Sequence, residues 1–152
     1  MANTQAMCTS FMAQLLTGTH NFTPSTGDTF KAALYLASAT VNAATTAYSS
    51  TGEVTGTNYT AGGVAVTNGT APASTNASAT AGTAYWTPSA SITYTNVTLT
   101  TAFDAVLIYN SSKSDKAVSV HTFGSQTVTA GTFTLTMPTN NTTNALLRLA
   151  TT

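Results

Sequence analysis

The segment Thr132-Phe-Thr-Leu-Thr-Met137 shows the clearest two-residue alternation in the chain, and Pro138 ends it. Because successive side chains of a strand point to opposite faces, its three apolar side chains share one face and its three threonines share the other. Threonine is β-branched and polar, so it suits the solvated face of a strand. The segment therefore predicts a half-buried β-strand.

Strand signals of this kind recur along most of the sequence. Residues 30–36 lack alternation and predict a strand that is covered on both faces. Residues 68–81 contain no large apolar side chain and predict a surface loop. The other expected strands cover residues 53–59, 64–67, 84–87, 92–100, 105–109, 117–123 and 145–149, with turns at residues 110–115 and 126–131.

Eight or nine short strands, separated by turn signals about every ten residues, predict an all-β fold. We expect a single β-sandwich over residues 1–152, with jelly-roll-like or immunoglobulin-like connectivity. A chain of this length buries about two thirds of its unfolded surface as one domain, without crosslinks.

The exception to the β pattern is the N-terminal segment, residues 1–18. Ser10 is placed to cap a helix of two turns, and Gly18 is placed to end it. Its apolar residues recur at helical spacing and are expected on one side: Phe11, Met12, Leu15 and Leu16. So short a helix is stable only when it is docked, either on its own domain or on a partner.

Charged residues are rare: the 152 residues contain four Lys or Arg and four Asp or Glu, for a net charge of zero. Acid–base catalysis, metal binding and phosphate binding all use the side chains that are scarce here. Nucleic-acid binding needs a basic patch, and none is present. Close packing of one protein surface on another has no such requirement.

No motif indicates an enzyme or a cofactor. His20 and His121 have no nearby metal-ligating partner, and the single Cys8 excludes a disulfide within the chain. No Gly-x-Ser-x-Gly sequence is present, and the four carboxylates are isolated from one another. We also expect no membrane span and no secretory signal, and hence synthesis in the cytoplasm.

Several short motifs follow one another along nearly the whole chain. They are Phe11-x3-Leu15-Leu16-x-Gly18-x-His20-x-Phe22, Asp28-Thr-Phe-Lys-x-Ala-Leu-Tyr35, Thr46-Ala-Tyr48, Glu53-Val54, Gly56-x2-Tyr59-x-Ala61-Gly62-Gly63, Leu107-Ile-Tyr-Asn110-Ser and Ala145-Leu-Leu-Arg148-Leu149. In this order they resemble a family of small virion proteins of tailed bacteriophages. The resemblance implies a particle component with a β-sandwich body rather than an enzyme.

We therefore expect a capsid cement or decoration protein that binds the head shell as a homo-oligomer, with a homotrimer favoured. Its partners would be the major capsid protein and copies of itself, without nucleic acid, membrane or cofactor. Its location would be the virion, assembled in the host cytoplasm. The candidate interface residues are Phe11, Met12, Leu15, Leu16 and Phe22, together with Lys113, Asp115 and Lys116 of one expected hairpin loop.

Alternatives remain open at each of these points. The N-terminal helix also fits a cap on one end of the sandwich, and the charged loop fits a solvated turn that keeps a sheet edge soluble. The alternative function is a tail- or fibre-associated module that contacts the host surface. In that case aromatic residues in Asn58-Tyr59 or Tyr85-Trp86-Thr87 would stack on sugar rings.

Overall fold

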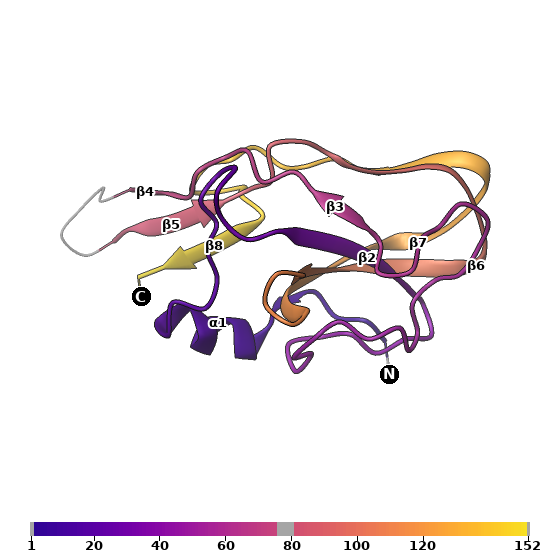
Figure 1. Ribbon diagram of the computed structural model, residues 1–152, viewed down its shortest axis with the longest axis horizontal. Coiled ribbons are helices and arrows are strands. Elements are labelled where there is room, and N and C mark those ends of the chain that lie inside the picture. Colours follow the sequence, from indigo (N-terminus) through magenta and orange to yellow (C-terminus); the bar gives the residue numbers. More distant parts are fainter. Residues whose placement is uncertain (1, 76–80, 152) are drawn as a thin grey trace.

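The computed structural model describes residues 2–75 and 81–151, and within them the protein is an all-β molecule with one short helix (Figure 1). This confirms the fold class that the alternating segments predict. The elements are β1 (Ala6–Met7), α1 (Thr9–Leu16), β2 (Phe30–Leu36), β3 (Val64–Val66), β4 (Ala73–Thr75), β5 (Thr83–Trp86), β6 (Ile92–Asn110), β7 (Lys116–Leu135) and β8 (Leu147–Ala150).

The strands form two antiparallel sheets. The larger sheet has the order β1-β7-β6-β2-β3, and the smaller has the order β4-β5-β8. Helix α1 lies at the same end of the molecule as the small sheet, on the left in Figure 1. No helix in the described part of the chain is long and apolar enough to cross a membrane.

The hairpin of β6 and β7 dominates the larger sheet and differs from the sequence prediction. The strands expected at residues 92–100 and 105–109 are one strand, and the turn expected at residues 126–131 lies inside β7. The two strands pair along their length, with register shifts on both sides of Val97 and of Phe103. These β-bulges accommodate the residues that predicted a turn, so the pairing of β6 with β7 continues where the sequence predicted that a strand would end.

Strand β2 forms the centre of the core, as its lack of alternation predicts. Ala32, Ala33, Leu34 and Tyr35 are all at most 1% exposed, so both faces of the strand are covered. β2 pairs with β6 on one side and with β3 on the other.

Two other predicted segments differ from the structure. Residues 53–59 make only isolated bridges, from Glu53 to Tyr35 and from Thr57 to Thr98. The loop expected over residues 68–81 contains β4, which pairs with β5, while residues 76–80 lie outside the described residues. Backbone hydrogen bonds make this pairing, and they do not require the large side chains on which the loop prediction depended.

Helix α1 begins earlier than predicted. Cys8 occupies the N-cap position with an extended backbone, whereas the Ser10 hydroxyl is buried without a hydrogen-bond partner among the described residues, so the prediction of a Ser10 cap is wrong. The preceding strand sets the start of the helix. The Cys8 N–H donates a hydrogen bond to the carbonyl oxygen of Val118, so the pairing with β7 extends to Cys8 and the helix follows directly. Gly18 ends the helix as predicted, with a φ of 64°.

Candidate functional site

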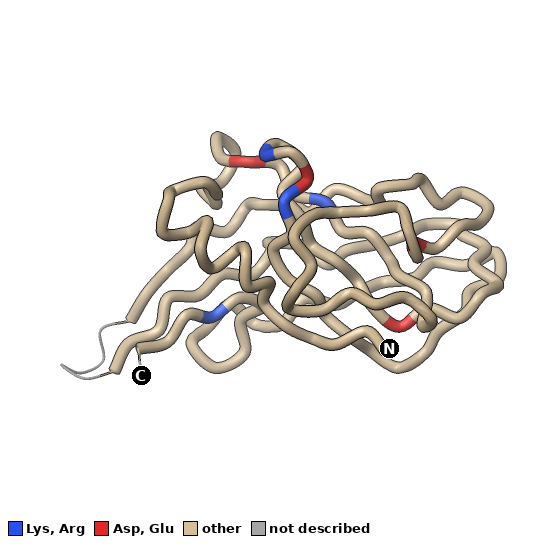
Figure 2. The backbone as a smooth tube through the Cα atoms, turned by 90° about the horizontal axis from the view of Figure 1, so that it is seen from below, with Lys and Arg blue, Asp and Glu red and all other residues tan. Residues whose placement is uncertain are grey.

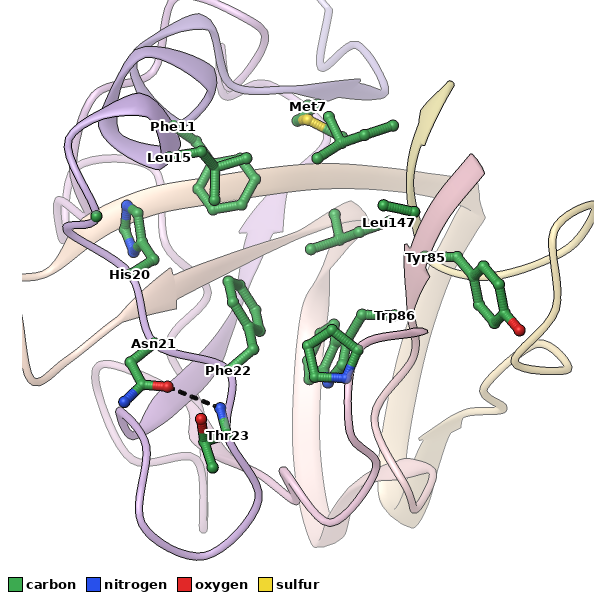
Figure 3. A pocket seen from close by; sticks show the side chains of 14 residues that line it. Met7, Phe11, Leu15, His20, Asn21, Phe22, Thr23, Tyr85, Trp86 and Leu147 are labelled. Atoms are coloured by element: carbon green, nitrogen blue, oxygen red, sulfur yellow. Dashed lines mark hydrogen bonds between the residues drawn. The ribbon is translucent and has the colours of Figure 1, made fainter. Parts of the chain in front are cut away.

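A cleft of about 520 Å³ opens between α1, the segment that follows it, and strands β5 and β8 (Figure 3). We call it the aromatic cleft. Its lining has no charged side chain, and the residues are Met7, Phe11, Leu15, Gly18, His20, Asn21, Phe22, Thr23, Pro72, Ala84, Tyr85, Trp86, Leu147 and Leu149. The cleft can therefore hold an apolar or aromatic group, and the titratable side chains in its lining are His20 and Tyr85.

The floor of the cleft is a set of packed rings. Phe22 stacks on Phe30 with ring centroids 4.4 Å apart and meets Trp86 edge-on at 4.8 Å. The Trp86 indole N–H is already used, since it donates to the carbonyl oxygen of Thr70 at 3.0 Å. These contacts hold the rings in fixed positions, so the cleft is pre-formed.

The apolar residues of α1 lie on two adjacent stripes rather than on the single side that the sequence predicts. Phe11 is buried and Leu15 is half-buried, and both line the cleft. Met12 is 43% exposed and Leu16 is 91% exposed. The only other large hydrophobic side chain so exposed in the described chain is Leu149, at 43%, and it also lines the cleft.

His20 forms the polar end of the cleft. Its Nε2 lies 2.7 Å from Gln14 Oε1, and its Nδ1 lies 2.9 Å from the amide nitrogen of Asn110. The Phe11 ring packs beside it, with centroids 4.9 Å apart. Burial is the main cause that lowers the pKa of His20 from its ordinary value of 6.5. His20 is thus a structural histidine that joins α1 to the end of β6.

The charged loop predicted between β6 and β7 is present, and a fourth charged residue, Asp28 from the segment before β2, lies against it. Lys113 Nζ lies 3.6 Å from Asp28 Oδ1. We call Asp28, Lys113, Asp115 and Lys116 the charged cluster. In Figure 2 a group of blue and red segments gathers at one edge of the molecule, while most of the tube is tan.

Asp28 connects the charged cluster to the aromatic cleft. Its Oδ2 accepts hydrogen bonds from the Asn21 backbone N–H at 2.9 Å and from the Asn110 amide at 2.7 Å. Burial acts to raise the pKa of Asp28, but these hydrogen bonds and the Lys113 ammonium outweigh it and lower the pKa below its usual value. The two groups of candidate residues, predicted separately from sequence, therefore belong to one connected region.

A buried carboxylate elsewhere in the molecule was missed by sequence reasoning. Glu53 accepts hydrogen bonds from the Tyr48 hydroxyl at 2.6 Å, the Tyr59 hydroxyl at 2.8 Å and the Gly62 N–H at 2.8 Å. The Tyr59 oxygen in turn accepts from the Leu34 N–H at 2.9 Å. All three donors to Glu53 lie within ten residues of it in the sequence, so the short spacing was the available signal.

The remaining reactive side chains are arranged for structure. His121 Nε2 lies 2.9 Å from the Ser119 hydroxyl on β7, but Ser119 is only 1% exposed, and burial lowers the pKa of His121 to about 4. Burial raises the pKa of the Cys8 thiol to about 11. Over residues 2–75 and 81–151, no three His, Cys, Asp or Glu side chains are grouped so as to hold a metal ion.

No protein-family model matches the chain, and neither a curated protein nor a solved structure is significantly similar to it. The aromatic cleft, the exposed residues of α1 and the charged cluster are therefore the structural basis for a functional proposal.

Proposed function

We propose that this protein is a non-enzymatic structural protein of a bacteriophage virion, a capsid cement or decoration protein that binds the head shell as a homo-oligomer. The observation that carries the proposal is the uncharged aromatic cleft with the exposed side chains of Met12 and Leu16 beside it. The assignment to a virion depends on the sequence motifs that resemble small virion proteins of tailed bacteriophages.

The surface around the cleft has the composition of the centre of a protein–protein interface. Such centres are enriched in aromatic residues and methionine and depleted in charged residues. Four aromatic side chains line the cleft, of which Phe11 and Trp86 are buried and Phe22 and Tyr85 are half-buried, and its lining has no charge. Aromatic residues in pre-formed pockets contribute most of the binding free energy of many interfaces. A protein partner on this surface would remove from water the exposed side chains of Met12, Leu16 and Leu149.

The partners in this proposal are the major capsid protein and other copies of this chain, with a homotrimer as the assembled unit. Copies with no net charge repel one another little, which favours their association. The charged cluster contains two acids and two bases, so it allows complementary contacts at the edge of such an interface. Closed symmetric assemblies suit a protein that occupies repeated sites on a shell.

The amount of the protein in purified virions tests the proposal. We expect its copy number, measured by quantitative mass spectrometry, to scale with that of the major capsid protein. Light scattering on the isolated protein should give the mass of a homo-oligomer. A copy number at the level of tail proteins would contradict the capsid role, and the protein would then be a tail- or fibre-associated module.

That alternative has less support from the aromatic side chains. The Tyr59 hydroxyl is bonded inside the protein to Glu53, and Trp86 is packed against Phe22 and is 3% exposed. Neither of these two rings is free to stack on a sugar from the host surface, and Tyr85 of the same motif is half-buried and lines the cleft. The head-shell role is therefore the one that we propose.

A further inference from the structure

Asn110 lies at the end of β6, fully buried, and its hydrogen bonds fix the direction of its amide group. Its Nδ2 donates to Asp28 Oδ2 at 2.7 Å, and its Oδ1 accepts from the Ser112 backbone N–H at 3.1 Å. A turned amide would place oxygen against the carboxylate and N–H against N–H. Because both contacts oppose the flip, the amide has one stable orientation.

This orientation determines the tautomer of His20. Asn110 Nδ2 is a donor, so His20 Nδ1, 2.9 Å away, must accept its hydrogen bond. The ring hydrogen is then on Nε2, which donates to Gln14 Oε1 at 2.7 Å. Neutral His20 therefore links Gln14 of α1 to Asn110 of β6, and the link needs Nδ1 to be unprotonated.

We propose that His20 is an acid-sensitive contact, in which protonation of Nδ1 separates the ring from Asn110 and loosens residues 14–23 from the sheet. A proton on Nδ1 faces the N–H of Asn110, and the amide cannot turn without opposing both Asp28 and Ser112. The Nε2 donor still bonds Gln14, so the ring moves with α1. The break occurs at the contact between His20 and Asn110.

The charges around His20 come from the segment before β2 and from the hairpin of β6 and β7. Burial is the largest effect on the pKa of His20 and lowers it; Asp28 raises it, and Lys116 and Lys113 lower it. Helix α1 contributes no charged residue. Since the folded pKa lies below the ordinary 6.5, the stabilisation is complete above pH 6.5 and is lost as pH falls through the folded value.

The consequence of loosening is a change in the aromatic cleft. His20, Asn21, Phe22 and Thr23 form one of its walls, and the Phe22 ring touches Trp86, the only tryptophan of the chain. When the wall moves away, water reaches the indole. The contact is a property of the isolated chain and does not depend on the proposed role in the virion.

Two measurements on the isolated protein test the proposal: nitrogen-15 NMR of the imidazoles and fluorescence of Trp86. Both are followed from about pH 8 to about pH 4, the range in which histidines titrate. We expect the Nε2–H tautomer of His20 at neutral pH. As His20 protonates, the amides of residues 14–23 but not those of β2 should lose protection from exchange, expressed as the protection factor relative to the intrinsic rate at each pH, and Trp86 emission should shift to longer wavelength. An Nδ1–H tautomer, or protonation with unchanged exchange, would overturn the proposal.

Matched variants assign the transition. His20→Gln should abolish the fluorescence shift, whereas His121→Gln, which removes the other histidine, should keep it. Asn110→Asp places an acceptor opposite Nδ1 and a second carboxylate against Asp28, so it should destabilise the protein while His20 is neutral, move the His20 titration to higher pH and remove the acid loosening. A His20→Gln protein that folds and keeps the shift would refute the assignment. If that variant does not fold, the wild-type titration and Asn110→Asp decide the outcome.

Discussion

Glu53 accepts a hydrogen bond from the Tyr59 hydroxyl at 2.8 Å, inside a molecule that has few charges to bury. The same carboxylate accepts from Tyr48 and from the Gly62 N–H, so one side chain joins three parts of the loop that follows β2. Burial raises the pKa of Tyr59 far above its ordinary value and keeps its hydroxyl protonated as a donor. Hydrogen bonds to Glu53 therefore hold this loop in place, where the sequence predicted a regular strand over residues 53–59.

Replacement of Glu53 should be among the most destabilising changes in the protein. Glu53→Ala leaves the buried Gly62 N–H and two part-buried tyrosine hydroxyls without this acceptor, and we expect a loss of about 3 kcal/mol or more in the free energy of unfolding. Tyr48→Phe removes one donor and should cost about 1 kcal/mol. Urea denaturation measures both. Equal effects of the two variants would show that the carboxylate is not the centre of the network.

The glycines Gly63 and Gly18 offer a matched pair, since both have positive φ, at 71° and 64°. A side chain on Gly63 would overlap the backbone of Ala32, whereas no atom of the described residues lies within 4 Å of the corresponding position on Gly18. Gly18→Ala should therefore cost about 1 kcal/mol from backbone strain alone. Gly63→Ala should cost several times more or prevent folding, as thermal unfolding will show. Similar melting temperatures would contradict the close approach of β2 to Gly63.

The sequence predicted features that depend on neighbouring residues. The run of apolar residues at β2, the glycine after α1 and the turn after Asn110 are local signals, and each is found in the structure. The bulged pairing of β6 with β7 was not predicted, because a bulge is defined by the partner strand. Lys113 and Asp28 are far apart in the chain, so only the fold brings them together.

The candidate site was predicted in part for the same reason. Phe11, Leu15 and Phe22 line the cleft, and they were candidates because of helical spacing and the family motifs. The opposite wall comes from β5 and β8, and no local pattern indicates that these strands face α1. Prediction of the cleft would have required the packing of two sheets.

His121 should make stability depend on pH. Burial lowers its pKa to about 4 in the folded protein, so its contribution is complete above pH 6.5 and is lost as pH falls toward 4. The loss should be roughly 2 to 3 kcal/mol over that range, because each unit of pKa corresponds to about 1.4 kcal/mol. Chemical denaturation at several pH values measures it. In His121→Gln the free energy of unfolding should vary less with pH, and the remaining variation should come from His20. An unchanged slope would exclude His121 as the cause.

The exposed stripe of α1 allows partner binding to be separated from folding. Leu16 is 91% exposed, so Leu16→Lys should change the free energy of unfolding by no more than about 0.5 kcal/mol. It places a charge beside the aromatic cleft, so under the proposed function it should weaken self-association and binding to head shells, because interface centres exclude charge. Phe11→Ala, on the buried stripe, should instead cost about 3 to 5 kcal/mol. Co-sedimentation with shells that lack the protein measures binding. If the folded Leu16→Lys protein binds like the wild type, the contact surface lies elsewhere than on α1.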